Sequence, residues 1–528
     1  MGVLDYSGNQ ALSNVTDISG GSPNTGEMRR KYNFSEKFTE LAIDQTPFFR
    51  LVSKIGNKPT DDPEFKFTEK RQSWMKRYAY CVAASGVAAP AADTTVMNDG
   101  VAAIDGEFDI ADSYLYMATD YLSEGNIQNI IGQAGKAIGS AGTRPEFYLP
   151  NQVVKVNYAL SSGGAFSDYA LYKVTSAEQG FLCHTTDEGT TPDSVVGGYA
   201  ASLPSGATAA SWYEVVQLTT VIVKAPSQND AHLMSFTGDA FVSDASPNAA
   251  YDNSIAEHLE VKRSYVMGTA YGEGSTLMQQ NWSDQPYSVG SGLTQIFRTE
   301  FGMSNTARAT ALKYEADEWA RLWRDKLIEH KWEIEQTALF GSQKTVSSVN
   351  YTQGAVDYIL GQGNLFSWTS GKNQDDFLHD LSQLVDPRYN NSKQMMFFCN
   401  TEVYNWLYTL AGYMEQNMTA AASGARFDFA VKGGKNAFGI DFSTISTPYG
   451  DINMARNIAL DNSGVKIMGV NMGYVKWRPL VGNGVNRDTS VYVGVQTLEN
   501  TGTDKRVDMI LTEGGFEWSM PECHAIWK

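Results

Sequence analysis

The chain has 528 residues and a formal net charge of −18, and only 19% of its residues are charged. This length allows a sizeable core in two to four compact regions. The acidic balance argues against a nucleic-acid reader, which would carry a basic stripe. The low charged fraction favours a loop-rich β protein that buries much surface in assembly over an ordinary solvated enzyme.

Cysteine spacing and hydropathy exclude further classes. The four cysteines have no CxxC spacing, so we expect free thiols rather than disulfides or a zinc site: Cys81, Cys183, Cys399 and Cys523. No stretch approaches the roughly 18 apolar residues needed to cross a bilayer. The first residues, MGVLDYSGNQALSN, lack the basic and apolar regions of a signal peptide, so we expect synthesis in a cytoplasm.

The first part of the chain is predicted to be an arm. Residues 1–27 are rich in Gly, Ser, Asn and Thr, which favours a segment that orders against a partner. A basic cluster follows at Arg29, Arg30 and Lys31, and it is either a solvated patch or a contact with an acidic neighbour. Apolar residues then recur at helical spacing over residues 34–49.

Two segments predict a long hairpin. Residues 64–80 alternate in part, as a strand does, and residues 254–272 are expected to form the return strand. Six cations would lie on this hairpin, either pairing with an acidic neighbour or simply solvated: Lys70, Arg71, Lys76, Arg77, Lys262 and Arg263.

The stretch between these strands predicts a small β module. A short helix is expected at residues 127–131, followed by four β-like runs, VVKVNYAL, YALYKVTS, FLCHTT and WYEVVQLTTVIVKA, separated by turn signals that include EQG. Tyr172, Trp212 and Tyr213 could form a sugar-binding platform, but packing in a small core is the favoured interpretation because exposed aromatic groups are uncommon.

A long charged helix is predicted from Leu312 to Leu339, because neither Pro nor Gly occurs before Gly341. Its single buried stripe would hold Trp319, Ala320, Trp323, Leu327, Ile334 and Ala338. The other faces would carry charges, among them Asp317, Arg321, Lys331 and Glu335, with helix-stabilising pairs four residues apart. The like-charged edge of Asp325, Glu329 and Glu333 is expected to meet cations from other segments or chains.

The remainder predicts a mixed α/β region. Residues 374–386 and 401–414 have the pattern of amphipathic helices, the second opening at Thr401. The continuous apolar run at 395–399 indicates a central strand covered on both faces. Further strands are expected at 441–445, 464–469, 490–495 and 506–518.

No catalytic constellation is recognisable. The six histidines include no HExxH motif, and the glycine-rich stretches lack both GxxxxGK[ST] and GxSxG. The acidic pairs Asp61–Asp62, Asp375–Asp376 and Glu333/Glu335 are interpreted as surface charge. We therefore predict no catalytic residue, no cofactor and no metal site.

Three motifs, taken in order, resemble the major capsid proteins of tailed bacteriophages, which share the Hong Kong 97-type fold. The first is Thr46-Pro47-Phe48-Phe49 with RLVSKIGNKP, and the second is GLTQIFRTEFGMSNTA with the helix that ends at Gly341. The third is Val475-Lys476-Trp477-Arg478-Pro479 followed by residues 506–517.

The resemblance implies an α+β capsid fold with an N-terminal arm, an extended hairpin, a spine helix, axial and peripheral domains, and an inserted β module. The implied divisions are an arm at 1–46, the first part of the extended loop at 47–81, a β-rich insertion at 82–224, the return part of the loop at 225–291, a spine-helix region at 292–345, an axial domain with peripheral elements at 346–470, and C-terminal strands at 471–528. Some relatives crosslink subunits through Lys and Asn, but no spacing in this chain identifies the residues.

The implied function is a shell of hexamers and pentamers around phage double-stranded DNA, assembled in the host cytoplasm and located in the virion. The implied partners are other copies, portal, scaffold and cement proteins, with DNA held nearby without sequence-specific binding, no membrane, and surface glycans as a further candidate. Two alternatives stay open: a carbohydrate-binding virion decoration protein and an encapsulin-like compartment shell.

Overall fold

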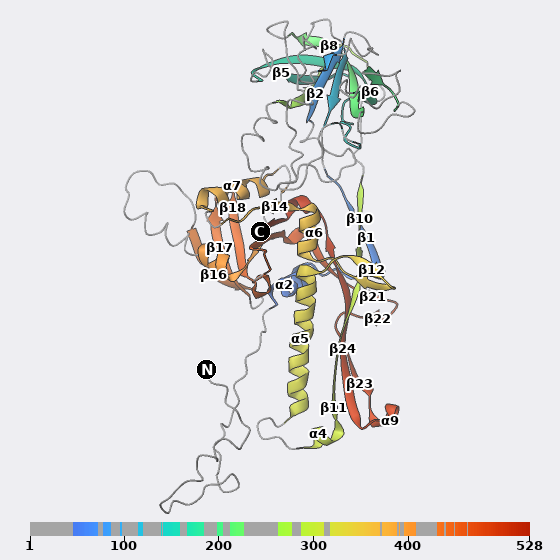
Figure 1. Ribbon diagram of the computed structural model, residues 1–528, viewed down its shortest axis with the longest axis vertical. Helices are drawn as coiled ribbons and strands as arrows, with labels where there is room; N and C mark the ends of the chain where they lie inside the picture. The colour runs from blue at the N-terminus through green and yellow to red at the C-terminus, as the bar shows by residue number, and fades with distance from the viewer. Residues whose placement is uncertain are drawn as a thin grey trace, which may run out of the picture. The chain divides into compact units, whose positions relative to one another are not determined.

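The computed structural model describes most of the chain after residue 45 (Figure 1). The described residues are 46–71, 78–85, 96–97, 114–119, 139, 141–158, 166–183, 198–203, 212–225, 262–276, 287–310, 317–369, 372–387, 390, 395–407, 430–437, 440–447, 449–461 and 463–528. Two compact units are distinguished: one contains Phe301–Ile328 and Gly494–Asp508, and the other contains Gln45–Glu300, Glu329–Val493 and Met509–Lys528.

An eight-stranded antiparallel sheet forms the β module of the larger unit. Seven strands run in the order β3-β2-β4-β8-β6-β5-β9, and β7 pairs with β6. Their bounds are β2 (Tyr78–Ser85), β3 (Val96–Met97), β4 (Tyr114–Ala118), β5 (Gln152–Tyr158), β6 (Asp168–Cys183), β7 (Gly198–Ala200), β8 (Trp212–Lys224) and β9 (Ser264–Thr269). Strand β5 buries every second residue, as a sheet with one covered face requires.

Two expectations for this module are corrected. The runs YALYKVTS and FLCHTT are not separate strands, because β6 continues through Glu178-Gln179-Gly180 and pairs with β8 along its length. The expected return strand is corrected in part: β9 pairs with Tyr78 and Ala79 at the end of the predicted first segment, but it also pairs with β5 and so belongs to the module. The expected helix at 127–131 lies outside the described residues.

The hairpin strand β1 (Glu64–Glu69) instead pairs with β10 (Ser288–Leu293). The segment SVGSGL has two glycines and no alternation, so it carries no strand signal. Across the pair, the rings of Phe65 and Phe67 lie where side chains at Gly292 and Gly290 would point, 2.4 Å from an ideal Cβ at each glycine. The glycines of β10 therefore make room for the aromatic side chains of β1.

A seven-stranded mixed sheet organises the C-terminal half, in the order β14-β25-β19-β15-β18-β17-β16. The strands are β14 (Asn364–Phe366), β15 (Met395–Cys399), β16 (Ala430–Ala437), β17 (Ile440–Thr447), β18 (Gly450–Arg456), β19 (Ile467–Asn471) and β25 (Ala525–Trp527). Helix α7 (Gln374–Leu384) covers one face, and α2 (Pro47–Ile55), α6 (Ala355–Gln362) and part of α5 (Glu318–Phe340) contribute to the core on the other.

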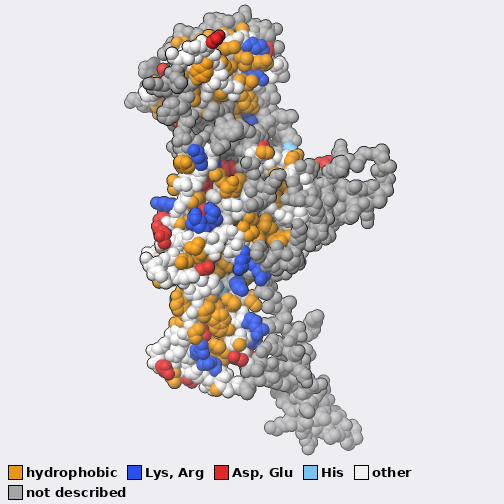
Figure 2. Space-filling model, turned by 180° about the vertical axis from the view of Figure 1, so that it is seen from behind, with side chains coloured by type: hydrophobic (Ala, Val, Ile, Leu, Met, Phe, Trp, Pro, Cys, Tyr) orange, Lys and Arg blue, Asp and Glu red, His pale blue; other side chains and the backbone are white. Residues whose placement is uncertain are grey.

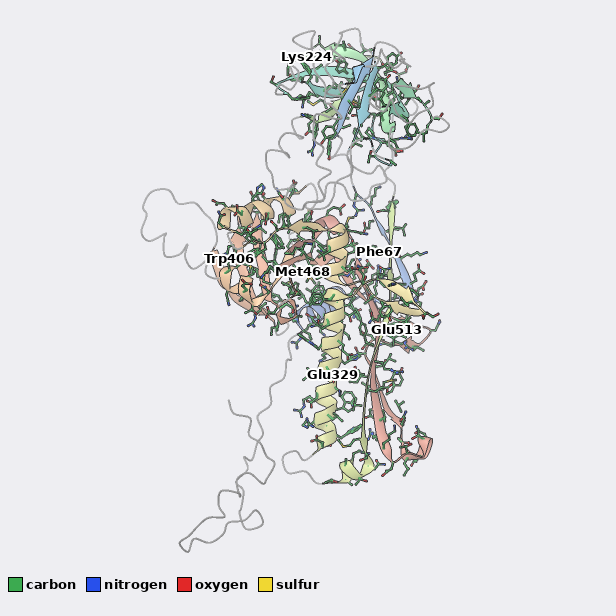
Figure 3. All side chains as sticks on the ribbon, in the orientation of Figure 1. Phe67, Lys224, Glu329, Trp406, Met468 and Glu513 are labelled. Carbon is green, nitrogen blue, oxygen red and sulfur yellow. The ribbon has the colours of Figure 1, made fainter. Side chains whose placement is uncertain are left out.

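The central position of β15 is confirmed. Its five residues are all buried, and it pairs with β18 on one side and with β19 on the other. Met396 and Phe398 join the core with α2, α5 and α6, whereas Met395, Phe397 and Cys399 join the core with α7. Met468 of β19, labelled in Figure 3, belongs to the first of these cores.

The last strand of the chain is buried in this sheet. The indole Nε1 of Trp527 donates to Asp380 of α7 at 2.7 Å, and Lys372 pairs with the same carboxylate. The backbone of Lys528 exchanges hydrogen bonds with Phe366 and Trp368. Residues 525–528 therefore hold α7 and β14 together.

A four-stranded sheet contains the long strand β24 (Lys505–Trp518), which lies between β11 (Gln295–Ser304) and β20 (Val475–Pro479) and also pairs with β23 (Ser490–Gln496). Strand β24 confirms the strand expected at 506–518, and it is buried on both faces from Ile510 onward. Two short hairpins complete the strands: β12 (Lys344–Val346) with β13 (Val349–Tyr351), and β21 (Val481–Gly482) with β22 (Val485–Asn486).

The other helices of the described residues are short, and side-chain hydrogen bonds to the backbone cap several of their starts. These elements are α4 (Asn305–Ala309), α9 (Leu498–Thr501), and the 3-10 turns η3 (Ile458–Leu460), η4 (Met472–Tyr474) and η5 (Pro521–Cys523). Helix α7 matches the predicted 374–386 and begins with a capping box between Asn373 and Asp376. Residues 401–407 are helical, capped by Asn400 rather than Thr401, and the rest of that predicted helix lies outside the described residues.

The long helix α5 starts later than predicted. Asp317 is not helical, and its carboxylate accepts hydrogen bonds from the N–H groups of Trp319 and Ala320. The buried residues also differ from the predicted stripe: His330, Ile334, Glu335, Ala338 and Leu339. Ala320 is exposed, so the expected continuous stripe is wrong for its first half.

The smaller unit packs around Trp319. The ring of Phe301 lies 5.4 Å from it, and the guanidinium groups of Arg308 and Arg506 lie 5.5 and 5.3 Å from the Trp319 ring centre. Arg321 pairs with Asp325 at 2.9 Å, as the spacing predicts, and also with Glu318.

Across the described residues, no helix is long and apolar enough to span a membrane.

Candidate assembly site

A buried carboxylate fastens α2 to the long helix. Glu335 of α5 is 0% exposed and accepts hydrogen bonds from the backbone N–H groups of Phe48 at 3.1 Å and Phe49 at 2.6 Å. The side-chain amide of Asn457 donates to the same carboxylate at 2.9 Å. We call these four residues the Glu335 clasp. The interpretation of Glu335 as a surface charge paired with Lys331 is therefore wrong.

The clasp follows from the way α2 begins. Pro47 occupies the first helical position, and Thr46 makes no side-chain cap hydrogen bond, so the first N–H groups need an acceptor from elsewhere. Glu335 supplies one from 287 residues away along the chain. A carboxylate at a helix N-terminus is also favoured by the helix dipole.

Burial dominates the electrostatics of the clasp. Removal from water raises the pKa of Glu335 from its ordinary 4.5 to about 7, although the hydrogen bonds from Phe49, Phe48 and Asn457 act to lower it. Around it, Lys331 on α5 and Arg50 and Lys54 on α2 are exposed. The carboxyl group therefore changes its charge near neutral pH.

A pH dependence follows. The folded chain holds a proton on Glu335 up to about pH 7, whereas an unfolded glutamate releases its proton near pH 4.5. Proton binding to Glu335 therefore stabilises the folded chain. This stabilisation is fully present below about pH 4.5 and is lost as the pH rises through about 7. Glu335→Gln cannot bind this proton. The difference in the free energy of unfolding between the wild type and Glu335→Gln should therefore fall by about 3 kcal/mol as the pH rises from about 4.5 to about 7.

Chemical denaturation of the unassembled chain at several pH values measures this difference. Burial lowers the pKa of His330 and His524 to about 4, so their stabilisation changes in the opposite direction, being lost as the pH falls below about 6.5. Both histidines are present in both proteins, so subtraction removes their contribution. Parallel pH curves would contradict a raised pKa at Glu335.

A second buried polar contact ties α5 to β11 and β24. His330 is 1% exposed, and its two ring nitrogens lie 2.8 Å from the hydroxyl groups of Thr299 and Thr512. Because burial lowers the pKa of the imidazole and keeps it neutral at neutral pH, one nitrogen can donate and the other accept. No local sequence signal marks this contact.

The base of the hairpin is held by an arginine. The guanidinium of Arg71 pairs with Glu522 at 2.5 Å and with Glu69 at 2.8 Å, and it also donates to the hydroxyl of Ser288. The Glu69 carboxylate accepts from the N–H of Met520 as well. Arg71 is 14% exposed, so it serves an internal ion-pair network, and its predicted role as a cation for a neighbouring subunit is corrected.

Removing this arginine tests the network. We expect Arg71→Ala to lower the free energy of unfolding by about 2 kcal/mol, because it leaves two largely buried carboxylates without their arginine partner. Lys66→Ala on β1, where the side chain is exposed, is the control and should change it by less than about 0.5 kcal/mol. Denaturant titration measures both, and equal effects would refute the network's contribution.

The other predicted cations are distributed differently. Lys70 is exposed, with its Nζ 5.0 Å from the ring centre of Tyr287. Lys262 is 2% exposed and Arg263 lies over the ring of Tyr78, so both belong to the module and not to the β1–β10 hairpin, which corrects their expected place. The other predicted cations lie outside the described residues: Arg29, Arg30, Lys31, Lys76 and Arg77.

The predicted acidic edge of α5 makes contacts within its own chain. Asp325 pairs with Arg321 of the same helix, and Glu333 accepts a hydrogen bond from Thr299. Glu329, labelled in Figure 3, is exposed on the same helix. At least two of the three carboxylates are therefore satisfied without a neighbouring subunit.

For Tyr172, the favoured interpretation of the aromatic residues, packing in a small core, is confirmed, and not the alternative of a sugar platform. Tyr172 is 0% exposed and belongs to the core of the β module, so it cannot present a ring to a ligand. The side chains of Trp212 and Tyr213 lie outside the described residues, although their backbone pairs with β6.

Among described residues, no group of three or more His, Cys, Asp or Glu side chains could hold a metal ion.

Several strands expose apolar side chains. On β10 and just before it, Val289 is 67% and Tyr287 is 64% exposed. The β12–β13 hairpin and β23 repeat this pattern, with exposed Val346, Val349, Tyr351, Val491, Tyr492, Val493 and Val495. Figure 2 shows hydrophobic side chains along much of the described surface. Strands of this kind need a covering partner.

The described residues thus combine buried polar contacts that fasten distant segments with strands that expose apolar side chains. The chain belongs to the SU10 major capsid protein family, whose model matches residues 12–528. It is therefore a major capsid protein, and this family membership confirms that part of the resemblance drawn from the motifs.

Comparison with solved structures found remote similarities. The holo-SrpI encapsulin complex of Synechococcus elongatus is 11% identical, covering 46% of this chain and 77% of its own, with a TM-score of 0.33. A structure from Microbacterium phage Oxtober96 is 12% identical (49% and 80% covered, TM-score 0.33), and the capsid of cyanophage P-SCSP1u is 11% identical (50% and 80% covered, TM-score 0.31). Comparison with curated proteins gave no match.

Proposed function

We propose that this capsid protein assembles into hexamers and pentamers of an icosahedral head that encloses double-stranded DNA. In this proposal the chain has the Hong Kong 97-type arrangement, with α5 as spine helix, the β1–β10 pair as the base of the extended loop, and the β module as an insertion. The observation that carries it is family membership over residues 12–528.

The exposed strands support the proposal. Val493 is 62% and Val289 is 67% exposed in the single chain, and neighbouring copies in a closed shell would cover such side chains. Lys70 and Glu329 are exposed and remain candidate contacts between subunits, as do the basic residues near the N-terminus. We further propose assembly in the host cytoplasm with scaffold, portal and cement proteins.

Electron microscopy tests the proposal directly. Expressed with its scaffold, the chain should form closed shells with hexameric capsomers in negative stain. Monomers or open tubes would refute it. Neighbouring genes discriminate the compartment alternative, because terminase and portal genes accompany a phage head and a cargo-enzyme gene accompanies an encapsulin-like shell.

A further inference from the structure

The β module presents an outward face that differs from the rest of this acidic chain. Along β5 and the first half of β6 the buried residues alternate with residues that point away from the module core, and the last residues of β8 and most of β9 are exposed beside them. The exposed Glu178 of β6 and the partly exposed Glu214 of β8 lie toward one end of these strands. At the other end the outward residues are partly or fully exposed and include no acidic residue: Val153, Lys155, Asn157, Tyr169, Leu171, Lys173, Val221, Val223, Lys224, Tyr265 and Met267.

Two lysines converge on one tyrosine in this set. The Nζ of Lys224, labelled in Figure 3, lies 3.5 Å from the ring centre of Tyr169, and the Nζ of Lys155 lies 4.5 Å from the same centre. Neither ammonium group pairs with a carboxylate of the described residues. The nearest acid along β6 is Asp168, whose carboxylate accepts from the N–H of Tyr169.

This arrangement favours an anionic partner. Two ammonium groups beside one ring concentrate positive charge there, and a carboxylate near the ring would be attracted by both. Lys173 adds a third positive charge on the same face of β6. We call Lys155, Tyr169, Lys173 and Lys224 the lysine–tyrosine face.

The apolar neighbours indicate that the partner is a protein. Met267 is 63%, Val221 is 61% and Val223 is 58% exposed around the lysines. Exposed aliphatic side chains match the apolar part of a protein surface, whereas a sugar ring stacks on aromatic faces and hydrogen-bonds to polar groups. Every copy of this chain carries a net charge of −18 and is therefore an abundant acidic partner.

We propose that the lysine–tyrosine face docks on an acidic surface of a second copy of this chain. The inference rests on the proposed function, because a shell brings copies together at high local concentration. Tyr169 and the exposed valines supply apolar contact, and the lysines give the contact its charge selectivity and its dependence on salt.

The test uses the full chain expressed with its scaffold, and compares the rate and yield of shell formation at low and high salt. Lys155→Gln/Lys224→Gln should slow assembly about tenfold at low salt, and the difference should shrink at high salt. Lys155→Arg/Lys224→Arg keeps the charges and should assemble like the wild type. Ala201→Glu/Ser202→Glu makes the same change in net charge at exposed positions after β7 and should have little effect.

The outcomes are distinguishable. If wild type forms shells and the double Gln variant forms them at the same rate, the inference is overturned and the proposed function stands. If wild type forms no shells, the proposed function fails. If Tyr169→Ala abolishes binding of the assembled particle to alginate, an acidic polysaccharide, without changing assembly, the face is a glycan site and the inference is also overturned.

Discussion

We expect Glu335→Ala to lower the free energy of unfolding by about 4 kcal/mol, because two buried donors and one partly buried donor lose their acceptor at once. The N–H groups of Phe48 and Phe49 and the amide of Asn457 would then have no acceptor in the clasp. A small cavity adds to the loss. Chemical denaturation of the unassembled chain measures the change.

Two variants control this experiment. Glu329→Ala removes an exposed glutamate from the same helix and should change the free energy of unfolding by less than about 0.5 kcal/mol. Glu335→Gln keeps one acceptor oxygen but brings an amide nitrogen among donors, so its effect should fall between the two. If Glu335→Ala were as mild as Glu329→Ala, the carboxylate would not hold α2.

Hydrogen exchange localises the effect. The amides of Phe48 and Phe49 should lose protection in Glu335→Ala before the amides of β15 do, because the clasp holds only the start of α2. Uniform loss of protection would instead indicate that α2 and the seven-stranded sheet open together.

Elements with strong local patterns were predictable from the sequence. The run at 395–399 is a buried central strand because both faces of the sheet are covered, and such a strand needs no polar alternation. Helix α7 was predictable because its amphipathic pattern and its start chemistry agree. In both cases the deciding information is local in the chain.

The Glu335 clasp was not predictable in this way. Glu335 lies in a heavily charged helix, where the pattern indicates a solvated residue, and its partners are 286 and 287 residues away in the chain. By residue type Thr46 before Pro47 would be a local cap for α2, and only the structure shows that its side chain makes no cap hydrogen bond. A helix start without a local acceptor requires one from tertiary structure.

Strand β10 was missed for a related reason. Its glycines lower strand propensity, and only the cross-strand rings of Phe65 and Phe67 explain why glycine is needed there. The alternation of β1 was visible, but the identity of its partner was not. Pairing of distant strands depends on which surfaces fit, and a single sequence does not reveal that.

A close approach of backbone to backbone also explains Gly515 of β24, where there is no room for a side chain. An added Cβ would lie 2.3 Å from the carbonyl oxygen of Leu293 and 3.0 Å from the ring of Phe65. The carbonyl belongs to the backbone at the end of β10, so rotating a side chain cannot relieve the clash. The neighbouring Gly514 faces the indole of Trp477, which is 1% exposed.

We therefore expect Gly515→Val to lower the free energy of unfolding by at least about 3 kcal/mol or to prevent soluble folding. Gly361→Ala is the matched control, because an added Cβ in helix α6 meets nothing within 4 Å and alanine favours helix by about 0.5–1 kcal/mol. Soluble yield and the denaturation midpoint measure both variants. A Gly515→Val chain with an unchanged midpoint would mean that β10 can move away from β24 at no cost, and the hairpin base would then be a flexible attachment, not a fixed one.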